Sequence, residues 1–250
     1  MFDLSGKTAL ITGSNRGIGK AILMSLAKNG ANVIMHCRKP TEESEKVLYE
    51  ASQLGVNCYA AYADLSDPNG THDLVEQINL LGQHVDILVL NASVQFRSSF
   101  TDVSDEEYDL QMNTNFRAPF KLVQHYIPKM LEKRWGRVIT IGSVQQTKPN
   151  PDLMVYSASK MALLNMVISL AGQVAPFGIT VNNIAPGAIL TDRNRDVLSI
   201  PQYEKKVLDS IPMNYIGDPY DIAGLAVYLA SPESQYMTGQ NIYIDGGKGL

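Results

Sequence analysis

Two residues of the chain have the types and the spacing needed to move a proton. Tyr156 and Lys160 stand four residues apart, which in a helix places both side chains on one face, one turn apart. A free tyrosine hydroxyl has a pKa of about 10, too high for efficient proton transfer at neutral pH, and a neighbouring ammonium group should lower it by about 1–3 units. Chance alone could supply one such pair in a chain with 12 tyrosines, so its surroundings must decide its meaning.

A serine stands at the end of a predicted strand, shortly before this pair. Ser143 follows the apolar run 138–141 and would hydrogen-bond the oxygen atom of a substrate held near Tyr156. Reduction of a ketone needs a hydride on carbon and a proton on oxygen, and oxidation of an alcohol needs the reverse. Taken singly, Tyr156 could be a helix-face aromatic and Ser143 a turn residue. Together with Lys160 they predict a proton-transfer site beside a hydride carrier.

A glycine-rich turn near the N-terminus predicts a phosphate site. Residues 12–19 read T-G-S-N-R-G-I-G, after an apolar run and before a helical stretch. Glycines let the backbone approach a pyrophosphate, and a helix N-terminus offers free N–H groups and a positive dipole end. A Walker loop is excluded because Lys20 is followed by Ala21. The common dinucleotide spacing G-x-G-x-x-G is also absent, because Gly13 and Gly17 are four residues apart.

The end of the second predicted strand indicates which dinucleotide is preferred. Folds that prefer NAD place an acidic residue there to bind the ribose 2′-hydroxyl, whereas an arginine accommodates the 2′-phosphate of NADP. No carboxylate occurs between Gly30 and Thr41, and Arg38 follows Cys37. Arg16 adds a second cation in the glycine-rich turn. We therefore predict NADP(H), with NAD(H) as the alternative cofactor; the competing interpretation is that both arginines are solvated surface charge.

The chain alternates short apolar runs with longer amphipathic stretches. Such alternation requires right-handed crossovers and predicts an α/β fold: a doubly wound, mostly seven-stranded parallel sheet with helices on both faces. No linker, repeat or low-complexity segment interrupts it, so residues 1–250 are predicted to form a single domain. The predicted strands are 8–12, 32–36, 57–61, 86–90, 137–141, 180–185 and 241–244, and the predicted helices are 19–28, 42–54, 71–81, 105–131, 157–175 and 219–230.

One segment departs from this alternation of predicted strands and helices. Residues 187–212 contain no predicted strand and are dense in charge, proline and isoleucine. Long loops in compact domains usually serve a function, and this one follows a late strand at the edge of the sheet where ligands bind. We predict that it is a substrate lid.

Composition excludes several classes of protein. A net charge of −4 gives no reason to expect a nucleic-acid or membrane partner. The two cysteines, Cys37 and Cys58, lie in predicted strands and are expected to be reduced, which suits a cytoplasmic protein. No secretory signal precedes the first strand, and the apolar stretches 85–90 and 161–171 are too short or too interrupted to span a bilayer. Neither cysteine has a partner with zinc spacing, so no metal site is predicted.

The pattern T-G-x-x-x-G-I-G, followed by Ser143, Tyr156 and Lys160 in that order, resembles the short-chain dehydrogenase/reductase family, a family of enzymes with a Rossmann fold. The resemblance implies that Asn115 is a fourth catalytic residue, which positions a water molecule joining Lys160 to solvent, and that Lys160 holds the nicotinamide ribose. Ser93 stands where the family usually has glycine, which adds a side chain near the cofactor. The implied cofactor-binding residues are Gly13, Ser14, Asn15, Arg16, Gly17, Ile18, Gly19, Arg38, Asp64, Leu65, Asn91, Ala92, Ser93, Tyr156, Lys160, Pro186, Gly187, Ile189 and Thr191.

Within this family the sequence resembles bacterial 3-oxoacyl-carrier-protein reductases and sugar or polyol dehydrogenases. Carrier-protein reductases need cations for their acidic carrier; Arg134 matches one such position, but Phe177 and Gly172 replace basic residues at others. We therefore expect a small polar alcohol or ketone, with the 3-oxoacyl-carrier-protein reductase as the alternative and a non-catalytic cofactor-sensing regulator as a remote one. The polar residues near the expected cleft are Gln95, Gln145, Gln146, Asn150 and Asp152.

The family resemblance also implies a homo-oligomer. Its members commonly form homotetramers through the two long helices after the fourth and fifth strands. Here the predicted helices 105–131 and 157–175 are long enough, and Met161 and Ile168 give the second one apolar surface. Helices that flank a sheet are apolar in any case, so a dimer remains the alternative.

Overall fold

The computed structural model describes all residues, 1–250, around one parallel sheet. The strand order is β3-β2-β1-β4-β5-β6-β7, and every neighbouring pair is parallel, which confirms the predicted Rossmann-type α/β fold. The strands are β1 (Thr8–Ile11), β2 (Asn32–Cys37), β3 (Cys58–Tyr62), β4 (Ile87–Leu90), β5 (Gly136–Ile141), β6 (Ile179–Pro186) and β7 (Asn241–Ile244).

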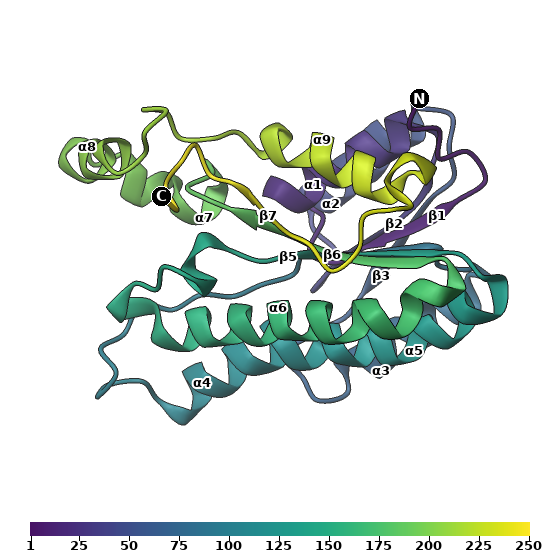
Figure 1. Cartoon of the computed structure of the whole chain (residues 1–250), viewed down its shortest axis with the longest axis horizontal. Coiled ribbons are helices and arrows are strands. Elements are labelled where there is room, and N and C mark those ends of the chain that lie inside the picture. Colours follow the sequence, from purple (N-terminus) through teal and green to yellow (C-terminus); the bar gives the residue numbers. More distant parts are fainter.

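Helices cover both faces of this sheet (Figure 1). One layer contains α1 (Gly17–Lys28), α2 (Glu42–Ser52) and α9 (Pro219–Ala230), and the other contains α3 (Gly70–Leu80), α4 (Asp105–Met112), α5 (Ala118–Lys133) and α6 (Met154–Val174). Because side chains alternate along a strand, Ala9 and Ile11 join the core under α1, whereas Leu10 joins the core under α5 and α6. Burial on both faces explains why the strands are apolar at nearly every position.

The order of the strands determines where a ligand can bind. The chain moves outward from β1 to β2 and β3, then returns to the other side of β1 with β4. Ligands of open α/β sheets bind in the crevice at such a switch point, outside the carboxyl ends of the strands. Thr12 and Asn91 lie there, at the ends of β1 and β4, and Asn91 N–H donates to the Thr12 hydroxyl at 3.0 Å.

The predicted helix 105–131 is interrupted. Helix α4 passes through a π-helical turn, Asn113–Arg117, before α5 begins. The interruption has a local cause: Pro119 has no N–H and cannot donate to the carbonyl of Asn115 four residues earlier, so the helix is rewound at this point. The wider turn sets Asn115 at the junction between the two helices.

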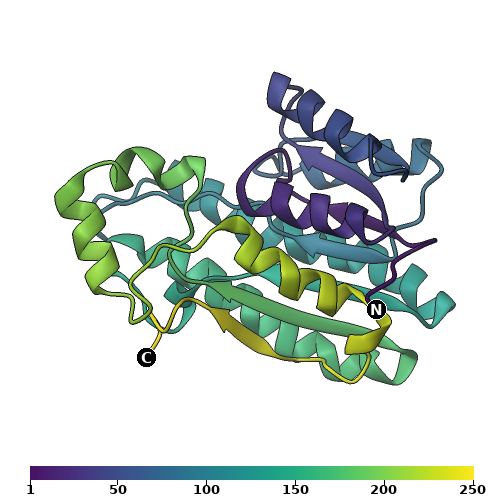
Figure 2. The same ribbon diagram turned by 90° about the horizontal axis from the view of Figure 1, so that it is seen from above.

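The segment 187–212, predicted as a loop, contains two short helices, α7 (Asp192–Leu198) and α8 (Pro201–Asp209). Thr191 and Asn194 form a capping box at the start of α7, and Pro201 occupies the first turn of α8, where its missing N–H costs nothing. Seen from above, both helices project beyond the sheet beside the C-terminus (Figure 2).

Helix α6 is the longest helix, and composition alone would let the span Pro151–Phe177 cross a membrane. Its mean hydropathy is 1.5, and 56% of the apolar window is buried inside the protein. The buried residues Leu163, Val167 and Ala171 belong to the core beneath the sheet. The helix is therefore longer than the predicted apolar segment 161–171, and its buried side chains pack in the core of the protein.

Candidate active site

A cleft of about 900 Å³ lies outside the carboxyl ends of the strands. Its walls come from the glycine-rich turn, from the ends of β2, β4, β5 and β6, and from α7 and α8. Pockets for small molecules and cofactors measure about 300–1,000 Å³, so this cleft is large enough for a cofactor and a small substrate.

The glycine-rich turn forms one end of the cleft. Gly13 adopts a left-handed φ of 63°, and a Cβ there would lie 2.9 Å from the Cα of Ala92. The first turn of α1 has no side-chain cap, because Arg16 makes no capping hydrogen bond, whereas α2 and α9 both begin with capping boxes. The N–H groups of Gly17 and Ile18 therefore remain for a ligand, as a dinucleotide phosphate requires.

Two of the predicted cofactor residues support this turn from behind. The buried Ser14 hydroxyl donates to the Ile11 carbonyl at 2.7 Å and points away from the cleft. The Asn91 amide donates to the carbonyls of Thr12 and Gly13, both at 2.9 Å. These contacts tie the turn to β1 and β4, so Ser14 and Asn91 fix the shape of the site.

A buried histidine, missed in the sequence, completes this support. His36 Nδ1 accepts a hydrogen bond from the Gly13 N–H at 3.2 Å, and Nε2 lies 3.1 Å from the Ala63 carbonyl. The neutral imidazole with its proton on Nε2 satisfies both contacts. Burial lowers the pKa of His36 to about 4, although the Ala63 carbonyl and Asp64 act in the opposite direction. Its signal in the sequence was a titratable residue inside an otherwise apolar strand.

This histidine should make the stability of the protein depend on pH. The pKa is about 4 in the folded chain and 6.5 in the unfolded chain, so between these values only the unfolded state takes up the proton. The free energy of unfolding should therefore fall as pH drops, by about 2–3 kcal/mol between pH 7 and 4.5. Urea unfolding of the wild type and of His36→Asn, whose Oδ1 can replace Nδ1, measures this difference. A variant with the same pH dependence as the wild type would contradict the assignment to His36.

Cations surround the predicted adenosine end of the cleft. Arg16 and Arg38 are exposed at its edge, and Lys39, which sequence analysis did not single out, joins them. Asp64 lies opposite: burial acts to raise its pKa, but hydrogen bonds from Ser66 and the charge of Arg38 hold it below its usual value. Leu65 completes this wall. The arrangement suits a ligand with a negative group beside Arg38.

Tyr156 and Lys160 lie at the opposite end of the cleft, one turn apart on α6, which begins three residues earlier than predicted. Lys160 is only 2% exposed, and its Nζ donates to the Ile141 carbonyl at 2.8 Å. Its Nζ is 5.7 Å from the centroid of the Tyr156 ring. Burial, with the nearby charge of Arg193, lowers the pKa of Lys160 to about 7.

Lys160 lies beside the Tyr156 ring, with its Nζ turned toward the end of β5. The pKa of Tyr156 is raised, because burial penalises the phenolate, and Lys160 is not among the groups that oppose this rise. Those groups are Arg193 and the hydroxyls of Ser143 and Ser93. Ser93 lies near the phenol, but its buried Oγ has no partner with good hydrogen-bond geometry.

Ser143 is held in place by buried amides. Its N–H donates to Gln146 Oε1 at 3.3 Å, and Gln146 Nε2 in turn donates to Asn241 at 2.8 Å. Gln146 is thus buried behind Ser143 and does not face the cleft, contrary to the expectation that it would meet a substrate. Gln145 and Gln95 do line the cleft.

Asn115 connects three parts of the site. Its Nδ2 donates to Ser159 Oγ on α6 at 3.0 Å and to the Val94 carbonyl at 2.9 Å, and its Oδ1 accepts from the Val94 N–H at 2.9 Å. With 1% exposure it lies behind the cleft wall. The side chain therefore holds the segment after β4, which includes Ser93, against the helix that bears Tyr156.

The remaining predicted site residues lie where expected around the cleft. They are Asn15, Gly19, Ala92, Pro186, Gly187, Ile189 and Thr191, all of which line it. Arg134 is different: it precedes β5 at the amino edge of the sheet, where its guanidinium donates to the Pro176 carbonyl. Within one chain this arginine is remote from the cleft. No group of three or more His, Cys, Asp or Glu side chains is arranged to hold a metal ion.

Comparison with known proteins gives a consistent picture. A family model described as enoyl-(acyl carrier protein) reductase matches residues 13–248. The chain is 38% identical to the 3-oxoacyl-[acyl-carrier-protein] reductase FabG of Escherichia coli over 246 residues, 98% of each chain. Among solved structures, a putative gluconate dehydrogenase from Agrobacterium tumefaciens has a TM-score of 0.94 at 30% identity, covering 99% of this chain and 98% of its own.

A second structure from Agrobacterium tumefaciens, a 3-oxoacyl (acyl-carrier-protein) reductase with NADP bound, also has a TM-score of 0.94, at 35% identity over 98% of this chain and 95% of its own. The chain belongs to the short-chain dehydrogenase/reductase family. It is an oxidoreductase of the kind that uses NAD(P).

Proposed function

We propose that the protein interconverts a secondary alcohol and a ketone on a small polar, sugar- or polyol-like substrate, using NADP(H). The observation that carries the proposal is the juxtaposition of Tyr156, Ser143 and Lys160 at the inner end of a cleft whose outer end is the glycine-rich turn. A dinucleotide with its phosphates at the turn has room to bring its nicotinamide toward these residues.

In this proposal each residue has a defined task. NADPH, when bound, would supply a hydride to the carbonyl carbon of a ketone, and NADP⁺ would accept one from the carbinol carbon of an alcohol. Tyr156 Oη gives a proton to the substrate oxygen during reduction and removes it during oxidation, while the Ser143 hydroxyl orients that oxygen. Lys160, with a pKa near 7, can exchange a proton at neutral pH, and Asn115 holds the wall through which a water relay would pass. Because burial raises the pKa of Tyr156, its hydroxyl keeps the proton that reduction needs, while the charge of Arg193 favours the phenolate that oxidation needs.

The preference for NADP(H) rests on the cations at the adenosine end. Arg38, Lys39 and Arg16 line this end, and Cys37 stands where an acid would bind a free 2′-hydroxyl. Structures of a gluconate 5-dehydrogenase and a 2-deoxy-d-gluconate 3-dehydrogenase, both putative, contain NADP and share the fold of this chain.

Arg38→Asp should reverse this preference. The change removes a cation from the 2′-phosphate and adds a carboxylate that repels it but can bind a ribose 2′-hydroxyl. We expect the ratio of kcat/KM for NADPH to that for NADH to fall by about 100-fold or more. Steady-state kinetics with both cofactors measure the ratio, and Lys28→Asp, outside the cleft, is the control. An unchanged ratio would show that Arg38 is only surface charge.

A 3-oxoacyl-[acyl-carrier-protein] reductase is the second candidate, supported by the names of several relatives. A panel of sugars, polyols, their keto forms and 3-oxoacyl thioesters, assayed by NADPH absorbance, separates the two. Faster turnover of acyl thioesters than of sugars and polyols would contradict the proposal of a small polar substrate. NADPH binding without turnover of any carbonyl compound would favour the remote alternative, a cofactor-sensing regulator.

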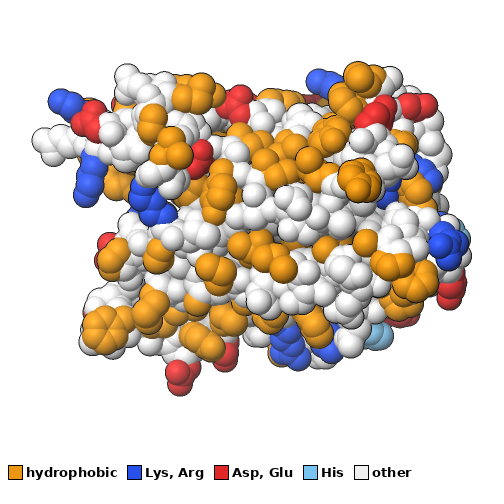
Figure 3. Space-filling view, viewed as in Figure 1, with side chains coloured by type: hydrophobic (Ala, Val, Ile, Leu, Met, Phe, Trp, Pro, Cys, Tyr) orange, Lys and Arg blue, Asp and Glu red, His pale blue; other side chains and the backbone are white.

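Four further features are part of the proposal. We place the protein in the cytoplasm, as a single domain in which residues 187–212 act as a lid, and we expect a homotetramer or a homodimer. The oligomer would use the exposed apolar side chains along α5 and α6, among them Phe120, Met161 and Ile168. Figure 3 shows apolar side chains spread over the face of the molecule that includes α6. Multi-angle light scattering measures the mass, and a monomer would contradict this part.

A further inference from the structure

Arg193 extends from the lid into the catalytic end of the cleft. It belongs to α7, and its Nη2 donates to the Ser93 carbonyl at 2.5 Å. Burial has the largest effect on the pKa values of Tyr156 and Lys160. The positive charge of Arg193 has the second largest effect, and it lowers both pKa values. The guanidinium therefore lies within electrostatic reach of the two groups proposed to move the proton.

Arg193 has no carboxylate partner, unlike two arginines near it. Arg195, on the same helix, lies 3.4 Å from Asp192, and Arg97 lies 3.9 Å from Asp152 and donates to the Tyr203 hydroxyl. Arg193 forms no ion pair, and its one hydrogen bond goes to a neutral carbonyl. Most of its N–H donors remain for a ligand, since a guanidinium presents a planar fork of them.

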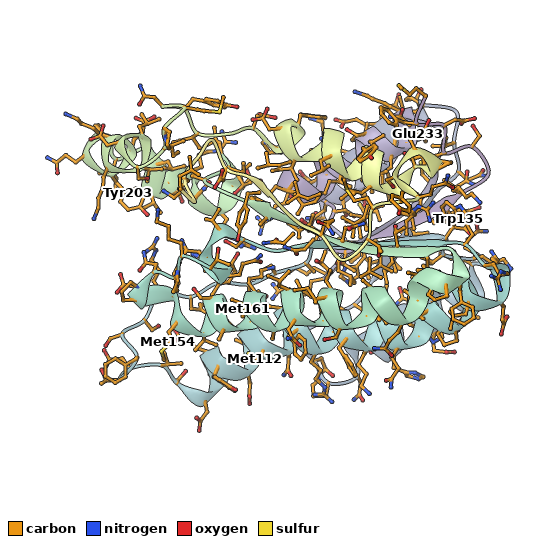
Figure 4. All side chains as sticks on the ribbon, in the orientation of Figure 1. Met112, Trp135, Met154, Met161, Tyr203 and Glu233 are labelled. Atoms are coloured by element: carbon orange, nitrogen blue, oxygen red, sulfur yellow. The ribbon has the colours of Figure 1, made fainter.

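The substrate end of the cleft is positive although the chain as a whole is acidic. The chain carries a net charge of −4. This end is lined by three cations, Arg97, Arg193 and Lys248, and by Lys160, whose pKa is about 7. Its one carboxylate, Asp192, already faces Arg195. Figure 4 shows Tyr203 on α8 in the upper part of the view and Met154 at the start of α6 in the lower part. A concave site with such a field attracts anions.

We propose that Arg193 binds an oxyanion of the substrate, so that the preferred substrate is a small hydroxy or keto acid, or a phosphate ester, in place of a neutral polyol. The inference rests on the proposed function and names the substrate class for the same site. A planar guanidinium matches a carboxylate or a phosphate with two parallel hydrogen bonds. The anion would bind Arg193 while the carbinol oxygen faces Tyr156 and Ser143.

The alternative role for Arg193 is structural: its bond to Ser93 could merely hold the lid closed. A latch would affect all substrates equally, whereas an anion receptor must discriminate between an acid and its neutral counterpart. The ratio of two substrates on one variant therefore separates the two roles.

The test compares gluconate with sorbitol, two six-carbon polyols of which only the first carries a carboxylate, using NADP⁺ as oxidant. We expect wild-type kcat/KM to favour gluconate, and Arg193→Gln to reduce the gluconate-to-sorbitol ratio by about 10- to 100-fold, the range for a charge-assisted hydrogen bond. Arg193→Lys should reduce this ratio less, because lysine keeps the positive charge and loses only the paired N–H donors of the guanidinium. Lys205→Gln, an exposed residue of α8 outside the cleft, should leave the ratio unchanged. A hexose phosphate in the same assay distinguishes phosphate from carboxylate as the source of the oxyanion.

A direct binding measurement keeps the two proposals separable. Calorimetry of the NADPH complex with gluconate and with sorbitol should show tighter binding of gluconate, lost in Arg193→Gln. If gluconate binds the variant as well as it binds the wild type, the anion receptor is refuted, while turnover of neutral polyols would still support the proposed function. If gluconate binding depends on Arg193 but no alcohol is oxidised, the receptor stands and the proposed function fails. Preference for an acyl thioester, unaffected by Arg193→Gln, would also refute the receptor.

Discussion

Tyr156→Phe should reduce turnover by about 100- to 10,000-fold, the range for removal of a general acid–base group, while NADPH affinity changes by less than threefold. The ring is buried, so phenylalanine fills the same space, and only the hydroxyl near Ser143 and Ser93 is lost. NADPH absorbance gives the turnover, and fluorescence titration gives the cofactor affinity.

The chain provides a matched control for this substitution. Tyr126, on α5, is also buried, its hydroxyl has no partner, and burial raises its pKa strongly. Tyr126→Phe should leave turnover unchanged, because that hydroxyl lies in the core between α5 and the sheet. If Tyr156→Phe kept most of the activity, Tyr156 would not be the proton donor.

Gly19→Ala should weaken NADPH binding by about 100-fold or more, because the added methyl group distorts the glycine-rich turn. A Cβ at Gly19 would lie 2.2 Å from the Gly13 carbonyl oxygen and 2.8 Å from Ser14 Cα, both of them backbone atoms. The turn must shift by more than an N–H···phosphate hydrogen bond tolerates, so several such bonds are lost together. Isothermal titration with NADPH measures the loss.

Gly172→Ala is the control for this second prediction. A Cβ at Gly172, in α6, meets no atom within 4 Å. The substitution should leave NADPH affinity unchanged and raise the free energy of unfolding by about 0.5–1 kcal/mol, since alanine is the better helix former. Unchanged NADPH affinity in Gly19→Ala would mean that the glycine-rich turn does not seat the phosphates.

Much of the fold could be predicted because its signals are local. Strands buried on both faces appear as continuous apolar runs, and the turn after β1 appears as glycines at fixed spacing. The π-helical turn was missed because it depends on the register of Pro119 against Asn115, not on the hydrophobic period. Helices α7 and α8 were missed because they are short and exposed, and because their signals are confined to their first turns, a capping box at Thr191 for α7 and Pro201 for α8.

The sequence indicated which residues lie at the candidate site but not how their side chains contact one another. Residue order placed Tyr156 and Lys160 at the cleft, yet no local pattern could show that Lys160 bonds the Ile141 carbonyl. His36 was missed, and Gln146 was wrongly assigned to the cleft, for the same reason. Each acts through a contact with a residue far away in the sequence, His36 with Gly13 and Gln146 with Asn241. Electrostatic partners such as Arg193, which come from another element, are equally invisible in a linear sequence.

The start of the lid segment is joined to Gly217, which lies shortly after the segment ends, and this affects the entropy of substrate binding. Gly217 N–H donates to the Ala188 carbonyl at 2.9 Å, and Leu190 N–H donates to the Gly217 carbonyl at 2.8 Å, so a short parallel bridge closes the segment at its base. Fixing a backbone costs about 1–2 kcal/mol per residue, and this bridge, with α7 and α8, orders the segment when the chain folds. The lid is therefore already ordered before a substrate binds. Substrate binding should then carry only a small cost in conformational entropy.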